Sequence, residues 1–156
     1  MTPGRMSAPL YAGLRSCTVA QFRDVHRYPG YLQDRRGIQH HQNDVRHEAR
    51  FDDSVGIYPR FIDGYGVLII PTTGRYMHIP YRAMLPKQVK SLIVAGRAIG
   101  GDRIAHAATR NMACCAVAGQ GAGVAAAVSI KDRCGFDEVS MTSVQAILKD
   151  QGVRIA

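Results

Sequence analysis

The sequence lacks the patterns that mark several common classes of protein. Its four cysteines include no C-x-x-C pair, so a zinc-finger type of metal site is not expected. Its basic residues give a net charge of +8 but form no run longer than two and match no DNA- or RNA-binding motif. A solvated basic surface is the favoured interpretation, and a basic nucleic-acid-binding module is the weakest of three functional hypotheses.

Signals for export and for membrane insertion are also weak. The amino-terminal residues lack the continuous apolar core of a secretory signal, and the cysteines fit reduced thiols, so we expect a cytoplasmic protein. The longest apolar run, Met112 to Ile130, approaches the length of a membrane span. It consists mostly of alanine and glycine, which contribute little transfer free energy, and we expect it not to cross a membrane.

The composition is that of an ordinary globular chain. Of the 156 residues, 46% are hydrophobic and 21% are charged, which is far from the signature of disorder. The patterning divides the chain into four segments. These are an unassigned, partly irregular segment (1–49), a β segment (50–86), a strand and long helix (87–131) and a carboxy-terminal helix (132–156).

The β segment shows strand-forming residues interrupted by turn residues. Val67 to Ile70 and Arg75 to Ile79 are rich in β-branched and aromatic residues, and a Pro-Thr-Thr-Gly turn separates them. This pattern predicts a β-hairpin. Pro80 and Pro86 then bracket a short piece that we expect to be extended, because proline excludes a long helix.

The next segment reads as strand, glycine-containing loop and helix. Ser91 to Arg97 is a short apolar run that stops at glycine, which is typical of a strand buried on both faces of a parallel sheet. A loop from Ala98 to Arg110 follows, and Asn111 is placed to cap a long helix reaching about Lys131. Near the end, Thr142 and Gln145 predict a capping box, with Gly152 stopping the last helix.

The strand end at Gly96, the Gly100-Gly101 turn and the helix start together predict a ligand site. Free N–H groups at the start of a helix suit a phosphate or an electron-rich flavin edge. The run Gly119 to Val124 resembles the dinucleotide fingerprint G-x-G-x-x-G, but its last position is valine and no strand precedes it. We therefore assign those glycines to the long helix. Cys114 and Cys115 are expected to be small buried side chains.

Several motifs in fixed order resemble one family. They are I-P-Y-R from Ile79, L-P-K from Leu85, V-A-G-R from Val94 and G-Q-x-A-G-x-A-A-A from Gly119. In combination, over about residues 50–153, the chain resembles the carboxy-terminal part of FAD-dependent oxidoreductases related to the fumarate reductase and succinate dehydrogenase flavoproteins. The resemblance implies an α/β fold, namely the carboxy-terminal portion of a two-domain FAD-binding flavoprotein whose amino-terminal dinucleotide-binding half is missing.

The resemblance also implies roles for particular residues. FAD is the implied cofactor, with its ring end against six positions: Gly96, Arg97, Asp102, Asn111, Met112 and Ala113. Hydride transfer to or from a small organic substrate is the implied chemistry, with His106 and Arg110 as the catalytic candidates and Tyr81 and Arg82 as further substrate-binding candidates. A second polypeptide or further copy of the chain is expected to complete the fold. The alternative hypothesis is a non-catalytic remnant or subunit-interaction protein that does not bind FAD alone.

Overall fold

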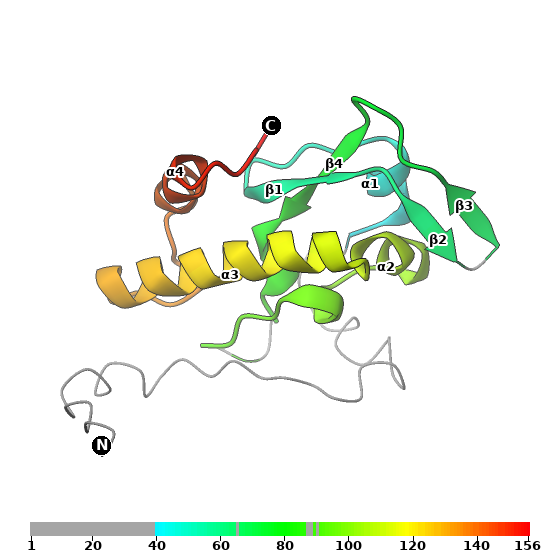
Figure 1. The fold of residues 1–156 in the computed structure, drawn as a ribbon. Coiled ribbons are helices and arrows are strands. Elements are labelled where there is room, and N and C mark those ends of the chain that lie inside the picture. Colours follow the sequence, from blue (N-terminus) through cyan, green and yellow to red (C-terminus); the bar gives the residue numbers. More distant parts are fainter. Residues whose placement is uncertain (1–39, 65, 87–88, 90) are drawn as a thin grey trace, which may run out of the picture.

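A computed structural model describes residues 40–64, 66–86, 89 and 91–156 (Figure 1). Within them, four short strands are followed by two adjoining helices and a carboxy-terminal helix. In chain order the elements are α1 (Gln42–Arg46), β1 (Ser54–Pro59), β2 (Ile62–Gly64), β3 (Val67–Ile69), β4 (Tyr76–Pro80), α2 (Arg103–Thr109), α3 (Met112–Asp132) and α4 (Met141–Asp150). The mixture of helix and sheet agrees with the expected α/β class.

The strands form two separate antiparallel pairs. β1 pairs with β4, with Tyr58 opposite Met77 and a bulge before Ile57. β2 pairs with β3, with Gly64 opposite Val67. The predicted hairpin between Val67–Ile70 and Arg75–Ile79 is therefore wrong in its pairing, although both strands exist. β2 ends only a few residues before β3 and is its nearer partner, and β4 pairs with β1.

The long helix α3 packs along β1, as Figure 1 shows. Its buried side carries a stripe at helical spacing: Cys114, Ala118, Gly121, Ala125 and Val128. A Cβ atom at Gly121 would lie 2.6 Å from Cβ of Val55, so helix and strand approach more closely than a side chain would allow. The helix bounds and the placement of Gly119 to Val124 inside it confirm the sequence prediction.

The ends of α3 and α4 are set by local residues. α3 stops where Arg133 adopts a left-handed conformation, with φ of 54°. The N-cap of α4 is Ser140, whose hydroxyl accepts from Ser143 N–H at 3.4 Å, so the predicted Thr142–Gln145 capping box is wrong. Gln145 instead donates to the carbonyls of Asp52 and Ser54. Its side chain thereby fixes α4 to the start of β1.

Three predictions for residues 81–110 need correction. Tyr81–Met84 forms a 3-10 turn rather than an extended piece, and Ser91 to Arg97 forms no strand. A buried parallel strand needs partners on both sides, whereas the bond from Val94 N–H to the Met84 carbonyl ties this segment to the preceding turn. A 3-10 turn (Gly96–Ala98) follows. The expected loop contains α2, because Asp102 supplies an N-cap for an alanine-rich helix.

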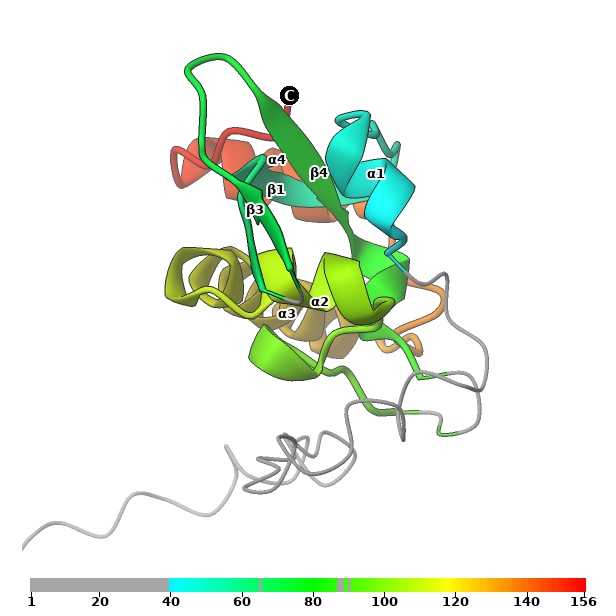
Figure 2. The same cartoon turned by 90° about the vertical axis from the view of Figure 1, so that its right-hand side faces the viewer.

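Among the described residues, α3 is the one helix whose length and composition would allow it to cross a membrane. Core helices of soluble proteins share these properties. In this structure α3 contacts β1, α4 and the 3-10 turn at Gly96–Ala98. Figure 2 shows the β2–β3 hairpin above α2, with α1 beside β4.

Candidate functional site

The junction between α2 and α3 brings together most of the residues predicted for the site. Arg110 is the C-cap of α2, and Asn111 is the N-cap of α3. The Asn111 side chain does not cap α3, because its amide donates to the carbonyls of Ala107 and Ala108 at 3.3 and 2.9 Å. The first N–H groups of α3 therefore keep no side-chain cap, and the positive end of the helix stays open.

The surface beside this helix end is lined by small or exposed groups. Met112 is 82% exposed, and Ala113 is also exposed. Gly96 adopts φ of +69°, a left-handed conformation that favours glycine, and a Cβ there would meet Cβ of Cys115 at 3.9 Å. The backbone of Gly96 thus lies close to the first turn of α3, where Met112 and Ala113 are exposed.

A chain of polar contacts fixes the arginines and the histidine of the junction. Arg97 Nε donates to the Arg110 carbonyl at 3.1 Å, and Arg110 Nη2 donates to the Asp63 carbonyl at 2.7 Å. His106 Nε2 lies 3.2 Å from the Arg97 carbonyl. Because a carbonyl only accepts, Nε2 carries a proton. These contacts connect β2, the Gly96–Ala98 turn, α2 and the start of α3.

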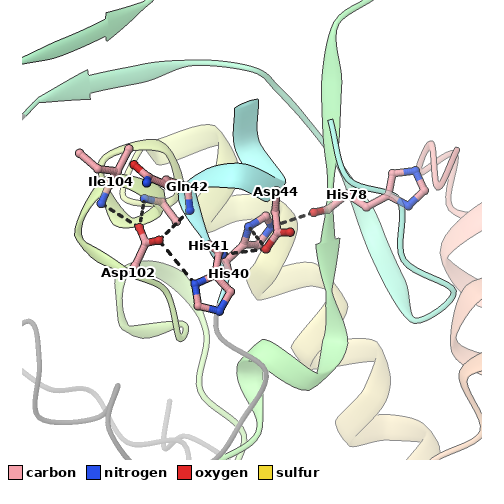
Figure 3. A network of polar contacts seen from close by, with 8 residues as sticks. His40, His41, Gln42, Asp44, His78, Asp102 and Ile104 are labelled. Carbon is pink, nitrogen blue, oxygen red and sulfur yellow. Dashed lines mark hydrogen bonds and ion pairs between the residues drawn. The ribbon is translucent and has the colours of Figure 1, made fainter. Parts of the chain in front are cut away.

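Asp102 lies apart from this group, at the opposite end of α2. Its carboxylate accepts from the N–H groups of Ile104 and Ala105 at 2.9 and 2.8 Å, and from Gln42 N–H at 2.7 Å (Figure 3). His41 Nδ1 is 3.6 Å from the same carboxylate. The carboxylate oxygens cap α2 and join it to α1, so the contacts of Asp102 are ones that stabilise the fold.

His40 forms the other half of the network in Figure 3. It is fully buried, its Nε2 is 3.0 Å from the His78 carbonyl, and its Nδ1 is 3.8 Å from Asp44. Burial lowers the pKa of His40 despite the nearby carboxylates. Among the described residues no group of three potential ligands could hold a metal ion. His40 and His41 instead contact carbonyl and carboxylate oxygens of neighbouring segments.

Tyr81 and Arg82 are also placed away from the junction. Tyr81 is buried, and its hydroxyl donates to the Phe136 carbonyl at 2.8 Å. Burial raises its pKa well above the usual range. Arg82 Nε is 3.0 Å from the Asp53 carboxylate. Both side chains thus hold the turn after β4 to neighbouring segments, and the structure does not bring them to the site with Arg110.

Cys115 and Asp63 are junction residues that the sequence reasoning did not assign to the site. Cys115 is partly buried, with Sγ 3.7 Å from the carbonyls of Thr109 and Arg110. Burial raises its pKa, and Arg97 opposes that effect. Cys114 is fully buried, as expected, and burial raises its pKa to about 12, whereas Cys115 is only partly buried and departs from the prediction. Cys115 lies one helical turn after Asn111, and this spacing could have placed it near the site. No local feature of the sequence indicated that the Asp63 carbonyl would contact Arg110.

Comparison with known proteins supplies a family. The model described as FAD dependent oxidoreductase matches residues 7–148, which is most of the chain. The match begins well before residue 50, where the sequence motifs placed the start of the resemblance. Neither the curated proteins nor the solved structures include a match to this chain.

Proposed function

The chain belongs to the family of FAD-dependent oxidoreductases, whose cofactor is FAD, and we propose that its α2–α3 junction contacts the ring end of the flavin. The observation that carries the proposal is the open amino end of α3 beside Gly96. Backbone N–H groups there suit a carbonyl oxygen of the pyrimidine ring. The positive end of the helix favours the negative charge of a reduced flavin.

The residues of the junction divide into cofactor-facing and substrate-facing groups. Gly96, Met112 and Ala113 would line the flavin, and Asn111 would keep the end of α3 open by bonding back to α2. Arg97 would hold Arg110 in place through its bond to the Arg110 carbonyl. When bound, FAD supplies the capacity to accept or donate a hydride.

Arg110 and His106 would act on the substrate. One nitrogen of the Arg110 guanidinium donates to the Asp63 carbonyl, which fixes the side chain, and its other donors would bind a carboxylate or carbonyl of the substrate. His106 holds a proton at Nε2, and its imidazole could donate a proton to the substrate. The proposed substrate is therefore a small organic molecule with an anionic or carbonyl group.

FAD uptake by purified protein tests the cofactor assignment. Quenching of flavin fluorescence should report uptake, and Gly96→Trp should abolish it because the indole would fill the space beside α3. Gly119→Trp is the matched control, since no atom lies within 4 Å of a Cβ at Gly119. Circular dichroism verifies that both variants fold. Uptake by Gly96→Trp equal to that of the control would refute the assignment.

The proposal extends to the adenosine end of FAD and to the cellular location of the protein. In the part of the chain that the structure describes, no G-x-G-x-x-G turn lies between a strand and a helix. We propose that the adenosine end of FAD is held by another segment or a partner polypeptide, and that the family relationship extends to the fumarate reductase and succinate dehydrogenase flavoproteins. The free thiols of Cys114, Cys115 and Cys134 support a cytoplasmic location.

A second candidate function is subunit interaction without catalysis. It is favoured by the β2–β3 hairpin, whose segment exposes Leu68 by 66% and Ile70 by 67%. In that case the protein should form an oligomer in sizing chromatography while failing to quench flavin fluorescence. Leu68→Asp should then yield monomers. An unchanged elution volume for this variant would exclude the hairpin as the interface.

A further inference from the structure

Tyr76 begins β4 and lies at a distance along the chain from the residues proposed to hold the flavin. Its ring stacks with that of His78, two positions later on the same strand, with centroids 6.4 Å apart and planes 9° apart. Side chains two residues apart on a strand share a face. This face of β4 therefore presents two parallel aromatic rings.

Two arginines from opposite ends of the described chain converge on the Tyr76 ring. Cζ of Arg50 lies 4.0 Å from the ring centroid, and Cζ of Arg154 lies 5.0 Å from it. Arg154 follows α4, where Val153 packs at Gly56 and the Ser54 hydroxyl donates to the Ile155 carbonyl at 3.4 Å. Folding thus brings two positive charges to one tyrosine.

The guanidinium of Arg50 is positioned by a neutral histidine. Its Nη1 is 3.1 Å from Nε2 of His78, and because arginine only donates, that nitrogen accepts. His78 Nδ1 lies 3.1 Å from the Phe51 backbone nitrogen and 3.3 Å from the Phe51 carbonyl oxygen, so both ring nitrogens have polar neighbours. Burial lowers the pKa of His78, which favours this neutral form.

Within the described part of the chain, the two arginines are not paired with acidic side chains, and Arg154 bonds to an oxygen of the last residue, Ala156. Among the described residues no acidic side chain lies within ion-pair distance of Arg50 or Arg154, and the nearby Glu48 is paired with Arg60 and Arg75 at 3.8 and 3.0 Å. Arg154 Nε donates to the backbone oxygen of Ala156 at 3.2 Å. A hydrogen bond from Arg50, and the charges of both arginines, hold the pKa of Tyr76 below its usual value.

We propose that Arg50, Tyr76 and Arg154 form a binding site for a phosphate group. Two guanidiniums offer forked donors that match the oxygens of a phosphate, and the phenol adds a further donor. A phosphate monoester carries close to two negative charges at neutral pH, which offsets the two adjacent positive charges. A carboxylate would neutralise one of them. The site is separate from the α2–α3 junction and does not depend on the cofactor.

Calorimetric titration of the full chain with inorganic phosphate tests the proposal, with sodium chloride at equal ionic strength as the reference. Phosphate should bind saturably, and Arg50→Ala and Arg154→Ala should each weaken binding by about tenfold, the size of one charge-assisted hydrogen bond. Lys149→Ala, which removes an exposed charge on α4, should leave binding unchanged. Binding no stronger than that of chloride, or unchanged in both arginine variants with unchanged circular dichroism, overturns the proposal.

Tyrosinate absorbance can be followed without a tryptophan background, and Tyr76→Phe separates Tyr76 from the other tyrosines of the chain. Phosphate should raise the pH at which tyrosinate absorbance first appears, and Tyr76→Phe should remove that response. A phosphate-induced shift that persists in Tyr76→Phe would exclude Tyr76 from the site.

The source of the phosphate is distinguished with vesicles. Cosedimentation with phosphatidic acid vesicles, but not with phosphatidylcholine vesicles, that is lost in Arg154→Ala would support a lipid headgroup as the ligand. Phosphate binding without cosedimentation would support a soluble phosphomonoester. Failure of both phosphate and phosphatidic acid to bind overturns the proposal.

Discussion

The contact between β1 and α3 and the junction between α2 and α3 use the same helix in opposite ways. At the middle of α3, Gly121 lies against Val55 so closely that no side chain fits between them. At its amino end, Met112 is 82% exposed and the first turn has no side-chain cap. One contact is held by apolar packing and the other by a few hydrogen bonds from Arg97, His106 and Arg110.

The difference indicates that stability and binding reside in separate parts of this helix. Close packing resists any increase in side-chain volume, whereas an exposed helix end tolerates substitution with little effect on folding. Substitutions at the two places should therefore separate loss of folding from loss of cofactor uptake.

The largest effect is expected for Gly121→Leu. A Cβ at this position would be 2.6 Å from Cβ of Val55, so α3 would have to move off β1. We expect the free energy of unfolding to fall by about 3 kcal/mol, at the upper end for overpacked cores. Urea denaturation measures the change. Gly119→Leu is the control and should stay within about 1 kcal/mol of the original chain; equal losses for the two variants would contradict the close contact.

Acidification is expected to have the next largest effect on the free energy of unfolding, through the buried histidines His40 and His78. Burial lowers the folded-state pKa of His40 and His78 below the unfolded value of about 6.5. The unfolded chain then binds more protons, so stability is full above that value and falls as the pH drops below it, by up to about 1.4 kcal/mol per pH unit for each histidine. Urea titrations between pH 8 and pH 5 measure the slope. His40→Gln should make it shallower; an unchanged slope in His40→Gln would contradict this origin.

Loss of the cap on α2 should have an intermediate effect. Asp102→Ala leaves the N–H groups of Ile104, Ala105 and Gln42 without the carboxylate, and we expect a loss of about 1–2 kcal/mol in unfolding free energy. Asp102→Asn should recover part of it, since the amide oxygen still accepts. If Asp102→Ala keeps its stability but loses FAD uptake, the residue contacts the cofactor as the sequence predicted.

The smallest effect on folding is expected for Met112→Glu. A carboxylate at the first position of α3 complements the helix dipole, so stability should change by no more than about 0.5 kcal/mol. Its negative charge would repel the pyrimidine carbonyl oxygen proposed to lie at the same place, and FAD uptake should weaken. Met112→Gln, of similar size and without charge, should bind more tightly than Met112→Glu. Equal flavin quenching by the two variants would argue against a flavin at this helix end.

The sequence predicted the regular elements that depend on local signals. α3 was predictable because its alanine-rich run begins after Asn111 and is long enough to define a helix. α4 was predictable from the spacing of Val144 and Leu148 and from Gly152. α2 was missed although Asp102 before an alanine-rich stretch is a recognisable N-cap signal.

The strand pairings and the site contacts depend on distant residues. Nothing in Val67 to Ile70 specifies whether its partner precedes or follows it, and in the structure it pairs with the preceding strand β2. An apolar run such as Ser91 to Arg97 becomes a strand where neighbours supply hydrogen bonds. The sequence grouped Gly96, Arg97, Arg110 and Asn111 correctly around the start of α3, but it gave no indication that Asp102 faces α1.

The close contact between Gly121 and Val55 also sets the position of α3 along its own axis. One turn away on either side stand Val117 and Ala125, and both carry the Cβ atom for which Val55 leaves no room. A slide by a turn, about 5.4 Å, would therefore replace glycine by an obstructing side chain. Val117 meets Gly56, the complementary gap in the strand, so the two surfaces fit in one register. The open end of the helix, roughly 14 Å from Gly121 at about 1.5 Å per residue, is thus aligned with Gly96 by a fit at the middle of the helix.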